Sequence, residues 1–405
     1  MSLDCTLKKF KSLEEKGYLG ILKRTFNFTD EPKFFQYSCV SPEGKFEGSS
    51  IDENKKIAKI KSCGEYIERY CLDHPNQVFI LDSYNNIKNS ALDPSIFINF
   101  RDCDLGFRKE EYIQKIKDSN LKWVEAINPL DNSRIKLPAQ LVYVDFDFND
   151  ELMIRPRVST GAAANETLEE ALYSGIMENI ERDSYMLSYL SQKQLPKINL
   201  EKYFQETFNY FKRYLLDLYV FDTTTDLNIP SFMCLNIDRT GLGPAVSVGL
   251  KSSLNPKEGV LGSIKESQQV RQWIRNLWIQ KGYDDSHLQK EILEIEDRGF
   301  YWYGLDKIAE LEYLINSSSF KDFNKIKSPT TKKNIVSYLK EKEISTYYVD
   351  LTLPEFKEIG FFVVKAIQPE LHPLFLEESF PCYFSERLNK ELDGKEVNKL
   401  IHPFM

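Results

Sequence analysis

The phrase Glu-x-x-Glu-Arg occurs twice in this chain and constrains its fold more than any other feature. Its two copies are Glu65, Glu68 and Arg69 and, further along, Glu178, Glu181 and Arg182. Residues three apart lie on one face of an α-helix, so each copy places two carboxylates side by side. Because like charges so placed repel, the fold must either leave each pair in water or bring cations between them.

Hydrophobic periodicity predicts a helix for the first copy. From Asp52 onward, apolar or small residues recur at steps of three and four, which is typical of one buried helix face. These residues are Ile57, Ile60, Gly64, Ile67 and Cys71. On such a helix Glu68 leans toward the interior and Glu65 lies further round.

The second copy is predicted to lie on a long helix that follows a loop of small residues. Thr167 and Glu170 form a T-x-x-E capping box, which marks the start of this helix. Its aliphatic stripe consists of Leu168, Leu172, Ile176 and Ile180. Glu178 and Glu181 point roughly opposite, so periodicity alone predicts that they face solvent.

Two interpretations of the repeated phrase remain open at this point. Each copy can be a wet helix face with local ion pairs, the common structural use of such a pattern. Alternatively, the four carboxylates converge on hard divalent cations, most plausibly Mg²⁺, which takes oxygen ligands and is usually shared with nucleotide phosphates.

The remaining pattern predicts an α+β fold of mixed sheets and long helices. Strands are predicted in "FFQYSCV", "QVFILDSY", "AQLVYVDFDF", "YVFDTTTDLNIPSFMCLNI", "TYYVDLT" and "GFFVVKAI", and a second long helix opens at "NPKEGV". Residues 280–345 are rich in charged residues and are predicted to be helical. No regular β-α-β alternation occurs, which argues against a doubly wound parallel sheet. We expect residues 1–50 to be an extension packed on a main domain at 51–405.

Composition excludes several classes of function. The formal net charge is -8 and no basic block occurs, so nucleic acid is not an expected partner. No apolar run is long enough to span a bilayer or to serve as a secretion signal, so we expect a soluble cytoplasmic protein. The seven cysteines show no CxxC spacing and the four histidines are far apart, which predicts reduced thiols rather than a structural zinc site.

Several ordered motifs resemble those of the YcaO family. "STGAAANETLEEALYSGIMENIERDS" resembles the family signature S-x-G-x-A-x-G-N-T-x-x-E-A followed by E-x-x-E-R, and "KSCGEYIERYC" is similar to its S-x-x-E-x-x-E-R motif. Later blocks, including "GLKSSLNPKEGVLGSIKESQQVR", follow in the family's order. The resemblance covers about residues 45–405 and is strongest to the SagD-type branch.

The resemblance implies a fold with acidic helices around an ATP and magnesium site. In that family ATP phosphorylates the oxygen of a peptide backbone amide, and a Cys, Ser or Thr side chain of the ribosomally made precursor closes an azoline ring. SagD-type members act in the biosynthesis of thiazole- and oxazole-containing peptides such as bacteriocins. Other branches form thioamides or amidines. A degenerate docking or scaffold subunit and an ATP-dependent ligase or kinase on small molecules are the alternatives.

The resemblance also assigns roles to particular residues. The metal-binding carboxylates would be Glu65, Glu68, Glu178 and Glu181. The nucleotide-binding set would be Ser62, Glu170, Arg182, Glu266, Gln269 and Arg271, and the catalytic set Arg182, Arg271 and the terminal residue Met405. Glu170 has a rival role in the capping box. Arg69 can instead pair structurally with acidic neighbours.

Three departures from the family pattern bear on activity. Ser49 stands where the family has the lysine of Gly-Lys-Gly, and Glu166 replaces the asparagine of Gly-Asn-Thr. The family's P-x-P-x-P tail, often "PHPFP", here reads "IHPFM", so that Ile401 and Met405 replace the flanking prolines. Because the family's tail reaches the active site, this change bears on azoline formation more than on ATP binding.

The expected partners follow from the resemblance. The substrate would be a precursor peptide, recruited by an E1-like or other leader-peptide-binding protein, because no such domain is recognisable in this sequence. Family members are commonly homodimers. Neither nucleic acid nor membrane is expected.

Overall fold

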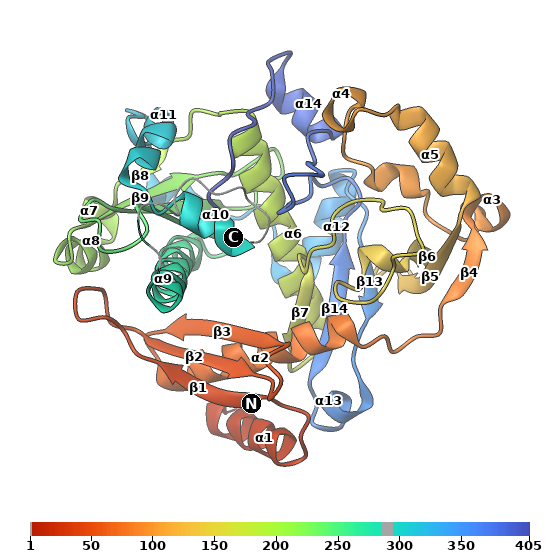
Figure 1. Cartoon of the computed structure of the whole chain (residues 1–405), viewed down its shortest axis with the longest axis horizontal. Coiled ribbons are helices and arrows are strands. Elements are labelled where there is room, and N and C mark those ends of the chain that lie inside the picture. Colours follow the sequence, from red (N-terminus) through yellow and green to blue (C-terminus); the bar gives the residue numbers. More distant parts are fainter. Residues whose placement is uncertain (1, 283, 285–294) are drawn as a thin grey trace.

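The computed structural model describes residues 2–282, 284 and 295–405 and arranges them as three sheets with helices between and around them (Figure 1). The small sheet has the order β1-β2-β3, the second β11-β10-β9-β8-β12, and the third β4-β5-β13-β14-β7 with β6 beside β5. Mixed sheets without β-α-β repetition confirm the predicted α+β class.

The strands are short. The small sheet contains β1 (Ile21–Thr25), β2 (Phe35–Val40) and β3 (Glu47–Asp52). The second contains β8 (Lys197–Ile198), β9 (Leu216–Asp222), β10 (Ser231–Asp238), β11 (Val246–Ser252) and β12 (Phe320–Lys321). The third contains β4 (Ile80–Ser83), β5 (Asn120–Ile127), β6 (Arg134–Pro138), β7 (Ala162–Asn165), β13 (Tyr347–Asp350) and β14 (Phe362–Ile367).

Three long helices connect the sheets, and local capping explains where each begins. In α2 (Lys55–Asp73), the Asn54 side chain accepts from the N–H groups of the first turn, and Asn255 does the same for α9 (Pro256–Lys281). Thr167 caps α6 (Leu168–Leu190), with Oγ1 accepting from the Glu170 N–H at 3.1 Å. The Thr167 cap and the opening of α9 at Asn255 and Pro256 agree with the predictions, whereas α2 begins at Lys55, three residues after the predicted start at Asp52.

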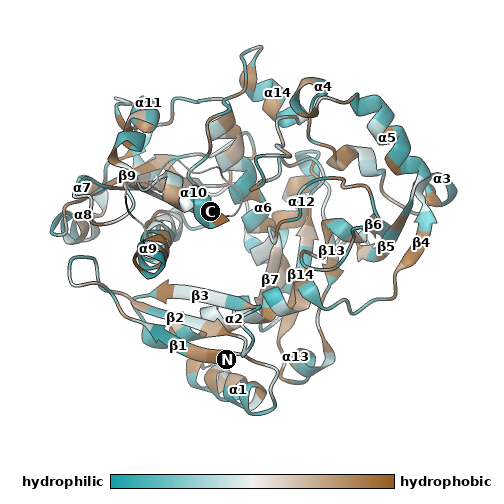
Figure 2. Cartoon of the chain, in the orientation of Figure 1, coloured by the Kyte–Doolittle hydropathy of each residue, from teal (hydrophilic) through white to brown (hydrophobic). Residues whose placement is uncertain are grey.

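The shorter helices lie mostly at the periphery. They are α1 (Leu3–Glu15), α3 (Tyr84–Ile87), α4 (Asp102–Leu105), α5 (Lys109–Asp118), α7 (Leu200–Tyr203), α8 (Gln205–Lys212), α10 (Ile295–Tyr301), α11 (Glu312–Ile315), α12 (Ile335–Glu341), α13 (Pro354–Glu358) and α14 (Glu386–Leu392). In Figure 2 the outer helix α5 is largely hydrophilic, whereas β14 is largely hydrophobic. The described parts of 280–345 do contain short helices; residues 283 and 285–294 lie outside the described residues.

Two local predictions were wrong. "AQLVYVDFDF" is not a strand: Ala139–Leu141 form a 3₁₀ turn and the rest is irregular, yet Val142 and Tyr143 are fully buried. The apolar run therefore reflected burial rather than strand pairing. Conversely, the small-residue loop before α6 contains strand β7, which pairs antiparallel with β14. The predicted boundary at residue 50 falls inside β3.

Candidate functional site

Three helices bring glutamates from distant parts of the chain to one place. Glu68 on α2 is close enough to Glu178 on α6 for their charges to repel, and Glu266 on α9 is similarly close to Glu181. In Figure 1 these helices converge beside β3 and β7. The repeated Glu-x-x-Glu-Arg phrase therefore marks two helices that face each other across the site.

Backbone N–H groups hold most of these carboxylates. The donors and acceptors are Ser49 N to Glu65 Oε2 at 2.9 Å, Gly161 N to Glu178 Oε2 at 3.2 Å, Ser252 N to Glu181 Oε2 at 2.7 Å, and Leu250 N to Glu266 Oε2. Within the described residues Glu68 accepts no hydrogen bond. Each held carboxylate keeps its second oxygen for other partners, and Glu68 keeps both.

Two glycines allow backbone and helix to approach this closely. A Cβ at Gly249 in β11 would lie 2.1 Å from the Ser263 carbonyl oxygen of α9. Gly161 has φ +87°, and its Cβ would lie 2.4 Å from the Ala366 carbonyl oxygen in β14. The small-residue loop in the sequence thus marks the place where the backbone reaches Glu178.

The Arg182 guanidinium lies at the centre of the carboxylates. It contacts Glu178 at 3.3 Å, Glu181 at 3.0 Å and Glu266 at 4.0 Å. Burial opposes its charge, but attraction from Glu181, Glu178 and Glu266 raises the pKa of Arg182. Its guanidinium also lies over the Phe404 ring, 4.2 Å from the centroid.

The predicted solvated face of α6 was wrong. Glu181 is 4% exposed, and the C-terminal half of α6 is buried on every side because β10, β11 and the C-terminal tail pack around it. Helical periodicity cannot distinguish a wet face from one covered by a charged site, since both are polar.

The electrostatics of the site fit a divalent cation. Burial and repulsion from Glu178 raise the pKa of Glu68 well above its usual range. Burial, opposed by Arg182, raises the pKa of Glu266 to about 7. Burial likewise raises the pKa of Glu65, against the attraction of Arg69. Half-buried carboxylates with raised pKa values are those that a bound cation would stabilise in the charged form.

Among the described residues, no three Asp, Glu, His or Cys side chains converge closely enough to hold a metal ion by themselves. Mg²⁺ usually binds one or two carboxylates and completes its shell with water and substrate phosphates. The arrangement of Glu65, Glu68, Glu178 and Glu181 therefore fits magnesium held jointly with a nucleotide rather than a closed protein site.

Of the predicted nucleotide-binding residues, Glu266 and Gln269 lie at this site. Gln269 Nε2 donates to the Ser49 carbonyl at 3.1 Å, which ties α9 to β3 beside Glu65. The Ser49 side chain bonds instead to Ser38 and Glu47. The contacts of Ser49 with the site thus use only its backbone.

Three other predicted residues have partners elsewhere. Arg271 is 1% exposed and forms ion pairs with Glu31 at 3.0 Å and Asp238 at 2.5 Å. Ser62 is fully buried and donates to the Lys59 carbonyl. Glu170 does not close the predicted capping box, because its carboxylate pairs with Lys332 near the surface. In the described part of the chain, these three residues make no contact with the predicted metal-binding glutamates.

The C-terminal tail lies along α6. The Tyr189 hydroxyl donates to the Ile401 carbonyl at 2.9 Å, and buried Arg298 donates to the His402 carbonyl at 3.0 Å. Met405 packs with a separate apolar cluster around Trp278. Phe404, not Met405, is therefore the tail residue whose contact with Arg182 the structure shows.

Sequence reasoning missed two cations near the site. Lys365 in β14 is 2% exposed and feels the charges of Glu178 and Glu68. Lys251 in β11 lies 3.8 Å from Glu181. A lysine inside the apolar strand "GFFVVKAI" is a signal that could have identified Lys365, because a charged residue is rarely buried without a function or a partner.

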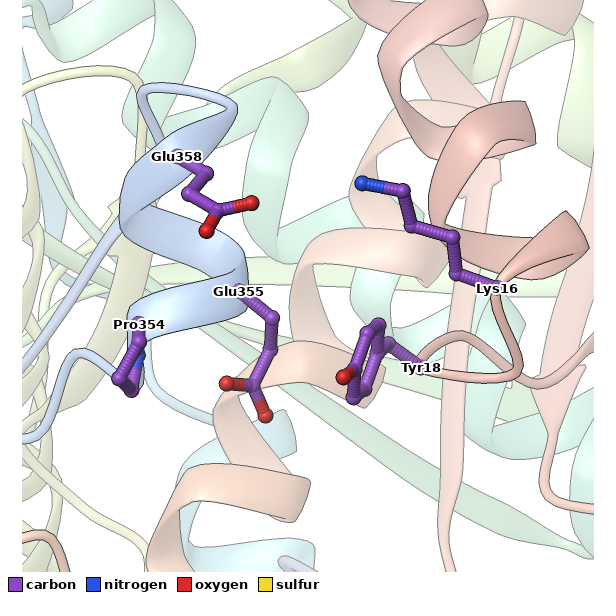
Figure 3. Close-up of a pocket in the computed structure, with 5 residues that line it drawn as sticks. All are labelled: Lys16, Tyr18, Pro354, Glu355 and Glu358. Atoms are coloured by element: carbon purple, nitrogen blue, oxygen red, sulfur yellow. The ribbon is translucent and has the colours of Figure 1, made fainter.

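A hollow on the surface lies apart from this site. It has a volume of about 450 Å³ and lies between the end of α1 and helix α13 (Figure 3). Its lining residues are Lys16, Tyr18, Pro354, Glu355 and Glu358. None of the predicted site residues contributes to it.

A family model and a curated relative match parts of this chain. The family model described as YcaO cyclodehydratase, ATP- and Mg²⁺-binding, matches residues 53–372. A curated relative, an uncharacterised protein of Methanothermobacter thermautotrophicus, is 25% identical over 161 residues, which are 38% of this chain and 42% of the relative. This chain thus spans less than half of that relative.

Solved structures share the fold. A heterocyclase in complex with substrate and cofactor has a TM-score of 0.82 at 20% identity, covering 100% of this chain and 58% of that one. The YcaO protein of Methanopyrus kandleri bound with AMPPCP and Mg²⁺ has a TM-score of 0.67 at 16% sequence identity, covering 92% of this chain and 91% of that one. The E. coli microcin synthetase McbBCD complex has a TM-score of 0.65 at 19% sequence identity, covering 86% of this chain and 88% of that one.

Among the described residues, no helix is long and apolar enough to cross a bilayer.

Proposed function

Because the chain belongs to the YcaO family of ATP- and Mg²⁺-binding cyclodehydratases, we propose that it uses ATP to phosphorylate backbone amides of a ribosomally synthesised precursor peptide. Cyclisation of Cys, Ser or Thr residues would then give azoline rings, as in the SagD-type branch. The observation that carries this proposal is the approach of Glu68 to Glu178 across α2 and α6, with Arg182 beside them.

The proposed reaction has three stages. The amide oxygen takes the γ-phosphoryl group of ATP as ADP departs. The substrate side chain then adds to the amide carbon and releases its thiol or hydroxyl proton. The carbon–oxygen bond then breaks, phosphate leaves with the electron pair, and the amide nitrogen loses its proton to form the C=N bond. Amide oxygen is a poor leaving group, so converting it to phosphate is the step that needs ATP.

The residues of the site match the needs of phosphoryl transfer. Glu65, Glu68, Glu178 and Glu181 would hold the magnesium ions, which neutralise phosphate charge when bound. Arg182 would stabilise negative charge developing on the transferred group, because its guanidinium is already fixed between the carboxylates and Phe404. Glu266 and Gln269 would contact nucleotide from α9. Roles for Ser62, Glu170, Arg271 and Met405 rest on the family resemblance alone.

Partners are proposed on the same basis. Two structural neighbours are a heterocyclase in complex with substrate and cofactor and the E. coli microcin synthetase McbBCD complex with pro-MccB17 bound. These relatives support a peptide substrate and an E1-like or other leader-peptide-binding partner for this chain. We further propose that it acts in the cytoplasm as a homodimer. We propose residues 1–50 as an extension of the YcaO domain at 51–405.

Mass spectrometry of a cognate precursor peptide tests the proposal. The peptide is incubated with this protein, its partner protein, ATP and Mg²⁺, with the Glu178→Gln variant as the matched control. A loss of about 18 Da per ring supports azoline formation, as simple mass arithmetic on the reaction requires. A gain of about 16 Da in the presence of sulfide would instead indicate thioamide formation. Unchanged peptide together with no ATP binding by calorimetry would indicate a docking subunit.

A further inference from the structure

A small cavity lies beside Arg182. It is lined by α6, by the end of β14 with the loop after it, and by the segment 155–160. Its polar lining residues are Thr160 and Asn179 together with Arg155, Arg182, Lys365, Gln368 and His372. The volume of about 20 Å³ holds about one water-sized group.

Two cations at this cavity form no ion pair in the described structure. Lys365 is almost fully buried, and within the described residues neither it nor Arg155 forms an ion pair with a carboxylate. Lys365 Nζ donates to the Val158 carbonyl at 2.6 Å, and the Arg155 guanidinium lies 5.5 Å from the Phe97 ring centroid. Buried charges in proteins are normally paired, so the buried Lys365 and the half-buried Arg155 together indicate a place for an anion.

The pKa values of Lys365 and Arg155 agree with a missing anion. Burial lowers the pKa of Lys365 to about 7, an effect that Glu178 opposes and Arg155 increases. Burial also lowers the pKa of Arg155. Both side chains thus lie where positive charge is poorly compensated by the protein, and a bound anion would correct this.

His372 is a third polar group that lines the cavity. His372 is 1% exposed, and its Nδ1 lies 2.8 Å from Ser385 Oγ, while its Nε2 is buried without a hydrogen-bond partner. Burial lowers the pKa of His372 to about 3, so the ring is neutral at physiological pH. An unsatisfied buried nitrogen costs free energy unless a ligand or water completes it.

We propose that this cavity binds an oxygen of a phosphoryl group, with Arg155 and Lys365 as its counter-ions and His372 Nε2 as a further contact. The inference rests on the proposed function, which brings a phosphoryl group to Glu178. Arg182 is shared by the cavity and the carboxylate site, because it lines the cavity and contacts Glu178 at 3.3 Å. The transferred group would lie between the carboxylates with their magnesium ions on one side and these cations on the other.

Calorimetric titrations of the full chain without any peptide test the inference. Arg155→Met removes an unpaired cation, and Arg157→Met, an exposed arginine two residues away, is the matched control. The probes are ADP, a non-hydrolysable ATP analogue, and inorganic phosphate added to the ADP complex, all with Mg²⁺. We expect Arg155→Met to bind ADP normally and to bind the analogue or phosphate roughly tenfold more weakly, the effect of losing one charged contact.

The two phosphate sources give different results. Weaker binding of the analogue places the γ-phosphate of ATP in the cavity before transfer, whereas weaker binding of phosphate alone places the released group there afterwards. Equal binding of all three probes by both variants overturns the inference. Because no peptide is present, failure to modify a peptide would count against the proposed function without affecting this result.

Thermal unfolding separates a binding role from a structural one. Removing an unpaired half-buried cation is expected to leave the melting temperature of Arg155→Met unchanged or higher. A large decrease would show that the cation supports the fold and would count against the inference. If Arg155→Met does not fold, Lys365→Met is measured with the same three probes and with the same interpretation.

Discussion

The backbone N–H of Gly161 donates to Glu178 Oε2 at 3.2 Å, joining the loop before β7 to the acidic face of α6. Asn179 strengthens the same junction, because its side chain donates to the Ala366 carbonyl in β14 at 3.0 Å. The third sheet therefore positions the second Glu-x-x-Glu-Arg phrase directly. Changes at this junction are expected to affect both stability and the carboxylate site.

Gly161→Ala is expected to destabilise the protein by more than about 2 kcal/mol, since positive φ and a clash with the Ala366 carbonyl act together. Gly44→Ala is the matched control: Gly44 has φ +75° but no atom within 4 Å of the added Cβ. It should cost only about 1 kcal/mol, from backbone strain. Urea unfolding measures both values. Equal losses would show that the close approach at Gly161 is unimportant.

Glu68→Gln is expected to reduce ATP hydrolysis about 100-fold or more while the protein stays folded. Glu68 accepts no hydrogen bond in the described structure and its pKa is raised, so a neutral amide should be tolerated without metal. Phosphate release and thermal unfolding measure the two effects. Glu53→Gln, at a largely exposed carboxylate at the start of α2, is the control. Full hydrolysis by Glu68→Gln would contradict the metal-site assignment.

The stability that Glu266 contributes to the metal-free protein is expected to be lost as pH rises from about 4.3 to about 7. Burial raises the pKa of Glu266 to about 7, while in the unfolded chain this carboxyl titrates near 4.3. The folded state therefore holds the extra proton between these values, and the associated stability is lost as pH rises through about 7.

Glu266→Gln supplies the comparison for this pH effect, because its side chain is neutral throughout. Its melting temperature, measured in EDTA, should fall less over the same pH interval than that of the unchanged protein. Identical slopes would show that Glu266 does not titrate there. Added Mg²⁺ and ATP should flatten the slope of the unchanged protein, since bound cations favour the charged carboxylate.

Phe404→Leu is expected to lower kcat for ATP hydrolysis about three- to tenfold, because leucine keeps the apolar packing but removes the aromatic face beneath Arg182. The melting temperature should change little, as the substitution nearly conserves volume. Leu400→Ala, at a half-exposed position in the same tail, is the control. A lower melting temperature with unchanged kcat would mean that Phe404 serves only packing.

The fold class and the main helix starts could be predicted from sequence because they depend on local chemistry. Thr167 and Asn255 cap the helices that follow them, and each capping hydrogen bond spans only two or three residues. The spacing of Glu65 and Glu68 likewise fixes their common helix face before any tertiary contact forms. The resemblance to a known family then indicated which partners these glutamates require.

Only the tertiary structure decided how the charges are paired. Glu181 was predicted to face solvent but is buried under β11, and Arg271 is committed to Glu31 and Asp238. The cavity at Lys365 likewise depends on segments far apart in the chain. Periodicity and capping act over a few residues, whereas burial and ion pairing depend on which distant segments pack together, and that information is not contained in any local pattern.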